Sequence, residues 1–243
     1  MSLLLDLNRW IHVIFGFLGL AAFWVPILTR KGSQPHRRFG RLFRYSAMVV
    51  ITAAVISVVL TLLRLSQVGQ GPAENPVGWA FLVFLGYLAL ATGVMLSHGI
   101  AVLGHKRDLR QLRTPYRRLL AWLSIAGSAF VIGWALYWQP PNAMLLYALS
   151  PLGIANGVGM LKLYRMPADD AKTWLYEHIG AMLGTGIAFH TAFAVFGVNQ
   201  LLQFELPGLL SLVPWLLPAA VGIPASVLWQ RYYRRQAHAP AAH

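Results

Sequence analysis

Residues 30–65 decide the fold of this chain, and they read RKGSQPHRRFGRLFRYSAMVVITAAVISVVLTLLRL. The first part of this stretch is strongly basic, whereas the second part, Tyr45–Leu65, carries a single charged residue, Arg64. A helix of about 20 predominantly apolar residues is long enough to cross the hydrocarbon core of a bilayer. The stretch therefore predicts a membrane-spanning helix that follows directly on a basic connection.

The same pattern recurs along the whole chain of 243 residues, of which 57% are hydrophobic and 11% are charged. An ordinary soluble domain is about half apolar and a quarter charged, so this composition excludes a soluble globular enzyme. We predict an all-α, polytopic bundle of transmembrane helices in a single integral membrane domain, residues 1–243, because the connections are too short for another domain. The seven predicted spans are Trp10–Leu28, Tyr45–Leu65, Trp79–Leu103, Leu119–Trp138, Ala143–Leu163, Tyr176–Leu202 and Gly208–Trp229.

The basic residues indicate the orientation of these spans. All 20 Lys and Arg except Arg9 and Arg64 fall at the connections after the first, third and fifth spans or in the C-terminal tail. Lys and Arg near the ends of spans mark the cytoplasmic side of a membrane. We therefore expect the N-terminus outside and the C-terminus inside, in a bacterial inner (cytoplasmic) membrane.

The net charge of +13 does not require a nucleic-acid partner. Basic residues beside a span are attracted to anionic lipid headgroups at about 1 kcal/mol per charge, which already explains their presence. The expected partner is therefore the lipid bilayer, with Arg37, Arg38 and Arg41 as candidate ligands of anionic headgroups. No pattern in the sequence specifies an oligomeric state.

The chain contains no Cys, which excludes disulfides, thiolate metal sites and cysteine nucleophiles. It also lacks the glycine patterns of nucleotide-binding loops and the G-x-S-x-G pattern of serine hydrolases. A haem or a metal ion would have to be held by His, Met, carboxylate or backbone groups.

The fifth span contains Ser150-Pro151 near mid-membrane, where proline frees a backbone carbonyl. Two interpretations are open, a kink stabilised by local hydrogen bonds or a break that lines a substrate path, and we favour the kink. Small residues at Gly153 and Gly157, and at Gly180 and Gly184 of the sixth span, form ridges that allow close helix packing. We expect these two spans to pack against each other.

Histidines supply the main candidate chemistry, because ionisable groups inside a bilayer are costly and often functional. His12 and His190 fall in the outer or middle part of their spans, and His98 and His178 fall toward the cytoplasmic side. Two levels of paired imidazoles could ligate haem b, although His178 and His190 are 12 residues apart and point in different directions around their helix. These four histidines are the candidate cofactor-binding residues, for one haem b or a quinone.

A second candidate site combines His98, His105, Glu177 and His178 near the cytoplasmic ends of the spans. Three imidazoles and a carboxylate are suitable ligands for a divalent metal such as zinc. No compact H-x-x-x-H or H-E-x-x-H pattern is present, and interfacial polar groups explain the same residues.

Four stretches together resemble a known family. They are Ile11-His12-x-x-x-Gly16 running to Phe23-Trp24; Lys31-Gly32 with His36-Arg37-x-x-Gly40-Arg41; Glu177-His178-Ile-Gly-Ala-Met182-Leu-Gly184 with Thr191-Ala192-Phe193; and Pro218-x-x-Val221-Gly222-x-Pro224 running to Trp229 and Arg231-Tyr232-Tyr233. The chain resembles an uncharacterised family of bacterial multi-pass membrane proteins, a domain of unknown function with an HR-x-x-G loop after its first helix. The resemblance implies a helical inner-membrane protein and no particular activity.

These observations leave three functions open. The favoured one is a His-centred intramembrane site that binds one haem b or a quinone for electron transfer. The alternatives are a non-catalytic membrane module that binds lipid, a partner or a small solute, and a metal-dependent membrane hydrolase. Whether the protein is an enzyme is left open by the sequence.

Overall fold

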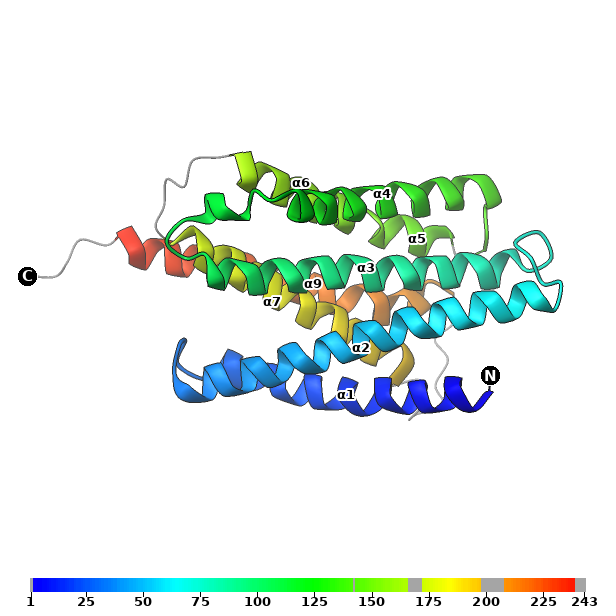
Figure 1. Ribbon diagram of the computed structural model, residues 1–243, viewed down its shortest axis with the longest axis horizontal. Coiled ribbons are helices and arrows are strands. Elements are labelled where there is room, and N and C mark those ends of the chain that lie inside the picture. Colours follow the sequence, from blue (N-terminus) through cyan, green and yellow to red (C-terminus); the bar gives the residue numbers. More distant parts are fainter. Residues whose placement is uncertain (1, 142, 166–171, 198–207, 239–243) are drawn as a thin grey trace, which may run out of the picture. The chain divides into compact units, whose positions relative to one another are not determined.

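The computed structural model describes residues 2–141, 143–165, 172–197 and 208–238. Within these ranges the chain is helical, without strands, and short connections join the elements. The helices are α1 (Ser2–Leu28), α2 (Gln34–Gln67), α3 (Pro76–Gly104), η1 (Leu109–Leu112), α4 (Pro115–Trp138), α5 (Ala143–Leu149), α6 (Pro151–Arg165), α7 (Thr173–Ala192), η2 (Phe193–Gly197), η3 (Gly208–Leu212) and α9 (Val213–His238) (Figure 1).

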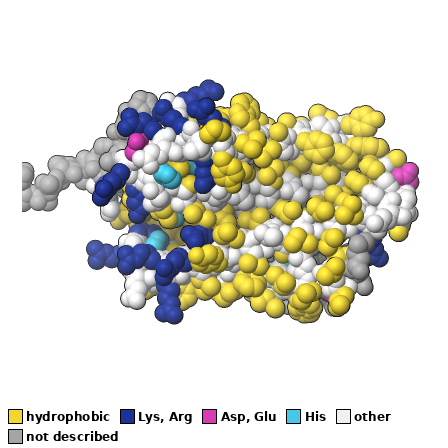
Figure 2. Space-filling model, in the orientation of Figure 1, with side chains coloured by type: hydrophobic (Ala, Val, Ile, Leu, Met, Phe, Trp, Pro, Cys, Tyr) yellow, Lys and Arg dark blue, Asp and Glu magenta, His cyan; other side chains and the backbone are white. Residues whose placement is uncertain are grey.

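Among the described residues, seven helical segments are long and apolar enough to cross a membrane. Each overlaps one predicted span, which confirms the all-α class and the number of spans; residues 198–202 of the sixth lie outside the described ranges. Large hydrophobic side chains point outward along these segments, and Leu28 and Tyr137 are each 79% exposed. Figure 2 shows hydrophobic side chains over the middle of the helices, and Lys and Arg near helix ends. Such a surface suits a lipid environment. The segments are Leu3–Leu28, Gln34–Gln67, Pro76–Gly104, Pro115–Trp138, Ala143–Arg165, Thr173–Gly197 and Leu210–Gln236.

The basic stretch before the second span is helical, whereas the sequence analysis treated it as a loop. Helix α2 begins at Gln34, and Ser33 caps it by accepting a hydrogen bond from the His36 backbone N–H at 3.4 Å. A proline in the first turn is compatible with this start because its missing N–H needs no partner there. The connection from α1 is therefore only a few residues long. The Lys31 ammonium donates to the Pro26 and Ile27 carbonyls at the end of α1, and partial burial lowers the pKa of Lys31.

The chain divides into two compact units, and the single integral membrane domain stays a prediction. The first unit comprises Met1–Val94 and Arg118–Leu161, and the second comprises Met95–Arg117 and Lys162–His243. Helices α3, α4 and α6 each continue from one unit into the other.

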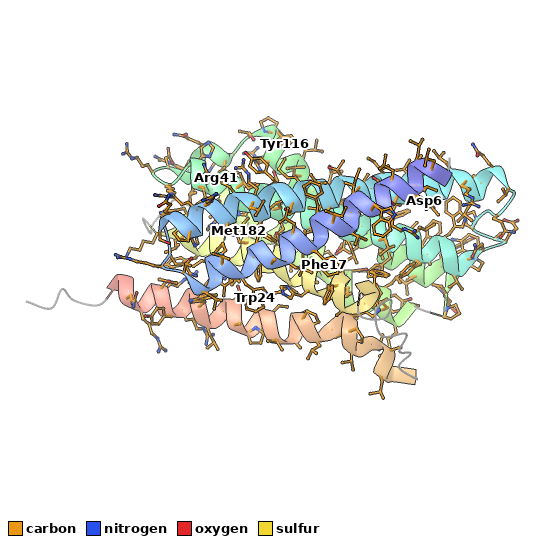
Figure 3. The ribbon with its side chains drawn as sticks, turned by 90° about the horizontal axis from the view of Figure 1, so that it is seen from below. Asp6, Phe17, Trp24, Arg41, Tyr116 and Met182 are labelled. Atoms are coloured by element: carbon orange, nitrogen blue, oxygen red, sulfur yellow. The ribbon has the colours of Figure 1, made fainter. Side chains whose placement is uncertain are left out.

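In the first unit, α1 lies antiparallel to α2, as Figures 1 and 3 show. Figure 3 places Asp6 and Trp24 near opposite ends of α1. Asn8 ties the two helices together by donating to the Ala53 carbonyl at 2.8 Å and to the Ser57 hydroxyl at 2.7 Å. The His12 Nδ1 adds a hydrogen bond to the Val50 carbonyl at 3.1 Å. These bonds let α1 and α2 pack as a pair without exposing polar groups to lipid.

The fifth span is broken at Ser150 into α5 and α6, and side chains fill the break. The Tyr87 hydroxyl of α3 donates to the Ser150 carbonyl at 2.7 Å and accepts from the Gly153 N–H at 2.8 Å. Ser128 of α4 also donates to the Ser150 carbonyl and accepts from the Ile154 N–H at 3.1 Å. We call this set of residues the Tyr87 cluster. The break is a stabilised kink, in agreement with the interpretation that the sequence favoured.

The glycines of α6 face α3 and α4 within the first unit, whereas the packing of the fifth span against the sixth, which the sequence analysis expected, stays a prediction. A Cβ atom at Gly153 would lie 2.8 Å from the Ser124 carbonyl oxygen, and one at Gly157 would lie 2.5 Å from the Ala121 carbonyl oxygen. Small residues therefore bring α6 against the α4 backbone. Periodicity predicted close packing correctly, but it did not identify the partner.

Candidate functional site

A buried histidine and a partly exposed carboxylate meet in the second unit, near the ends of two helices. His98 lies in the last two turns of α3, and its Nε2 is 3.0 Å from Oε2 of Glu177 in the second turn of α7. His98 is only 4% exposed, whereas the Glu177 side chain is 36% exposed. The carboxylate therefore connects a buried imidazole with the surroundings of the protein.

A third side chain completes this group. The Tyr164 hydroxyl, from the last turn of α6, lies 3.4 Å from Nδ1 of His98, and the ring of Tyr164 is 3% exposed. We call His98, Glu177 and Tyr164 the His98 cluster. Sequence reasoning missed Tyr164, although its position beside Arg165 at the end of a span put it at the expected depth of Glu177.

The close approach of α3 and α7 determines the geometry of the His98 cluster. A Cβ atom at Gly99 would lie 2.5 Å from Cε of Met182, and one at Gly184 would lie 2.5 Å from Sδ of Met95. Each helix thus places a methionine over a glycine of the other. The Nδ1 of His178 also donates to the Gly99 carbonyl at 3.0 Å. Together these contacts bring Glu177 within reach of His98.

Cationic side chains surround the same helix ends. Arg117, in the first turn of α4, donates to the carbonyl and the hydroxyl of Ser97 at 3.0 and 2.8 Å. The Lys106 ammonium lies 4.4 Å from the centre of the Trp174 ring, and the Arg234 guanidinium lies 4.6 Å from that of Tyr176. Cations held over aromatic faces are attracted by the ring quadrupole. The second unit therefore has a positively charged end next to Glu177.

The donor set at His98 does not fit a haem or a metal ion. Both of its ring nitrogens are engaged, Nε2 by Glu177 and Nδ1 by Tyr164. A ligand of iron or zinc needs one imidazole nitrogen lone pair directed at the metal. The predicted pairing of His98 with His178 around one haem is therefore not arranged in this structure.

The predicted metal ligands do not come together. Of that set, His98 and Glu177 are in contact, whereas His105 turns back to the Ala101 carbonyl in the last turn of α3 at 2.9 Å. Within the described ranges, no group of three or more His, Cys, Asp or Glu side chains could hold a metal ion.

The other predicted cofactor ligands are in different surroundings. His12 lies in the first unit, bonded to the Val50 carbonyl, and His190 lies in the second, where its Nδ1 donates to the Gly186 carbonyl at 2.7 Å. The candidate lipid ligands Arg37, Arg38 and Arg41 are exposed at the beginning of α2. Arg41 follows Arg37 by four residues and Arg38 by three, so it neighbours both on the helix surface.

Comparison of the chain with models of known protein families, with curated proteins and with solved structures gave no match in any of the three.

Proposed function

We propose that the chain is a multi-pass protein of the bacterial inner membrane that binds a quinone at the His98 cluster and exchanges protons with it. The membrane assignment is supported by the seven apolar helices and their exposed hydrophobic surface. The resemblance to the HR-x-x-G family is a prediction that is consistent with it.

One observation carries the proposed site: a buried imidazole held between a phenol and a partly exposed carboxylate. A quinone ring offers carbonyl oxygens that accept hydrogen bonds, and it gains or loses protons when it is reduced or oxidised. His and Glu are suited to such acid–base exchange near neutral pH. A quinone is also membrane-soluble, so it can reach helix ends at the membrane interface.

Direct binding of a tritiated short-tailed ubiquinone to the protein in lipid nanodiscs tests this proposal. We expect saturable binding that is at least tenfold weaker in His98→Gln and Glu177→Gln, which corresponds to about 1.4 kcal/mol or more. His105→Gln is the matched control, because His105 is near the same helix end but bonds only to its own helix. Absence of saturable binding, or equal affinity in all variants, would overturn the proposal.

The proposed orientation places the N-terminus outside and the C-terminus inside, on the basis of the basic helix ends. The absence of Cys from the chain allows a direct test with single cysteines. In intact cells we expect a membrane-impermeant maleimide to label Gln70→Cys, between α2 and α3, and not Gln111→Cys, which becomes reactive after permeabilisation. The reverse pattern would contradict this orientation.

A second candidate function is a module that binds anionic lipid. It is favoured by the exposed face of Arg37, Arg38 and Arg41, and by the cations held over Trp174 and Tyr176. Phosphatidylglycerol should then raise the melting temperature more than phosphatidylcholine does. Replacing the three arginines by glutamine should remove part of that difference, and an unchanged difference would exclude them as headgroup ligands.

A further inference from the structure

Six histidines have described side chains, and they divide into two classes according to which ring nitrogen donates a hydrogen bond. Five rings place Nδ1 within 2.7–3.2 Å of a backbone carbonyl oxygen, namely His12, His36, His105, His178 and His190. A carbonyl oxygen can only accept a hydrogen bond, so Nδ1 carries the hydrogen in each of these rings. Each of these histidines donates to a backbone carbonyl, and their neutral rings share the Nδ1–H tautomer.

His98 has the opposite arrangement. Its Nε2 faces the Glu177 carboxylate, which when ionised can only accept, so Nε2 carries the hydrogen. In a neutral ring Nδ1 is then the acceptor, and the Tyr164 hydroxyl must donate to it. The three groups therefore form a directed chain, in which Tyr164 donates to His98 and His98 donates to Glu177.

We propose that Tyr164 is a positioning residue: Glu177 fixes His98 in the Nε2–H tautomer, and the Tyr164 hydroxyl, by donating to Nδ1, holds the imidazole ring so that Nε2–H points at Oε2 of Glu177. This leaves the other carboxylate oxygen, Oε1, for the ligand: ionised, it can accept a hydrogen bond from a quinol hydroxyl, and protonated, it can donate one to a quinone carbonyl. His98 and Tyr164 keep their own protons in both cases. The identity of the ligand rests on the proposed function, whereas the directed chain does not.

Nuclear magnetic resonance of histidine ring nitrogens tests the directed chain in the ligand-free protein, because protonated and unprotonated ring nitrogens have well-separated shifts. We expect His98 in the Nε2–H tautomer, assigned by the loss of its signal in His98→Gln, and Nδ1–H tautomers for His12, His36, His105, His178 and His190, each assigned by the corresponding substitution. In Tyr164→Phe, which keeps the ring but lacks the hydroxyl, the unprotonated Nδ1 of His98 should change its shift because it no longer accepts a hydrogen bond, while Nε2 stays protonated. Tyr137→Phe, at a highly exposed position, should leave the spectrum unchanged.

Two results would overturn this inference. One is a wild-type His98 that carries hydrogen on Nδ1 or on both nitrogens near neutral pH, and the other is an unchanged His98 signal in Tyr164→Phe.

Binding of the short-tailed ubiquinone separates this inference from the proposed function. We expect Tyr164→Phe to bind about threefold more weakly, because the His98 ring is no longer held at Nδ1 and its hydrogen bond to Glu177 is less well aligned. If the tautomers are as expected and the quinone does not bind, the proposed function fails and the directed chain stands. If the quinone binds and Tyr164→Phe leaves both the His98 signal and the affinity unchanged, the directed chain fails alone.

Discussion

The two units contain polar clusters that are built from similar side chains but differ in access. The Tyr87 cluster is closed: Tyr87 is 4% exposed, Ser128 and Ser150 are fully buried, and the hydroxyls bond to backbone groups freed by the break between α5 and α6. The His98 cluster is open, because Glu177 is 36% exposed and presents a carboxylate. A buried polar group whose partners are all provided by the protein stabilises the fold. A cluster that reaches the surface can also exchange protons or bind a ligand.

The largest loss of stability should come from disturbing the packing around the Tyr87 cluster. In Gly153→Ala the new methyl group would lie 2.7 Å from the Tyr87 hydroxyl and 2.8 Å from the Ser124 carbonyl oxygen, which cannot move aside easily. We expect a loss of about 1–3 kcal/mol of stability, measured by thermal unfolding in detergent. Gly159→Ala, on the same helix with open space around it, is the control. Equal melting temperatures in the two variants would contradict the close packing.

The same substitution in both clusters sharpens the comparison. Tyr87→Phe removes the nearer acceptor of the buried Gly153 N–H, which keeps the Ser150 carbonyl at 3.2 Å, and removes a donor to that carbonyl, so we expect a loss of about 1–3 kcal/mol of stability with unchanged ubiquinone affinity. Tyr164→Phe should cost about 1 kcal/mol or less, because its hydrogen bond is longer at 3.4 Å. Unfolding and ubiquinone binding of both variants measure this contrast. A larger loss of stability in Tyr164→Phe would show that the His98 cluster is primarily structural.

A smaller effect, on ubiquinone affinity, should follow from increasing the distance between α3 and α7. A Cβ atom at Gly99 would lie 2.7 Å from Cβ of Ala181, so Gly99→Ala must push α7 away from α3 and weaken the contact between His98 and Glu177. We expect about fivefold weaker ubiquinone binding, or about 1 kcal/mol. Gly104→Ala has nothing within 4 Å and should bind as the wild type does. Identical affinities would show that ligand binding tolerates a wider gap.

The smallest effect should come from an ion pair outside both clusters. Asp108 accepts hydrogen bonds from the side chain and backbone of Arg110, and these hold the pKa of the exposed Asp108 carboxyl below its usual value. Its contribution to stability is therefore present above the ordinary pKa of Asp and is lost as the pH falls through the lowered pKa. Thermal unfolding of Asp108→Ala should differ slightly from wild type at pH 7 and not at pH 2. A difference that persists in acid would assign the effect to something other than this carboxylate.

The sequence predicted the helices better than it predicted their neighbours. Hydropathy identified all seven spans because each needs a long apolar stretch regardless of its partners. The sequence analysis placed the start of the second span at Tyr45, because the preceding residues are too highly charged to be recognised by hydropathy. Ser33 and Pro35 nevertheless mark the start of α2.

For the candidate site, the position of each residue within its span indicated its depth in the membrane but not the direction of its side chain. Depth correctly placed His98 and Glu177 at the same level, and the structure brings them together. Depth also grouped His105 with them, although the side chain of His105 returns to its own helix. Tyr164 was missed because an ordinary aromatic residue at the end of a span does not stand out. Which side chains meet depends on helix rotation, and a single sequence constrains rotation only weakly.

The glycine contacts also imply a difference in mechanical compliance between the two units. In the first unit, Gly153 and Gly157 face backbone carbonyls of α4, which have no freedom to rotate away. In the second, Gly184 faces the end of Met95, an unbranched thioether chain that adapts to irregular gaps by changing rotamer, whereas Gly99 faces both the end of Met182 and Cβ of Ala181. A sub-ångström sliding of α7 along α3 can thus be absorbed by Met95 at Gly184 and is limited by Ala181 at Gly99, whereas the same displacement of α6 along α4 meets rigid backbone at both glycines. The more compliant helix contact is therefore the one between α3 and α7, and α7 carries Glu177.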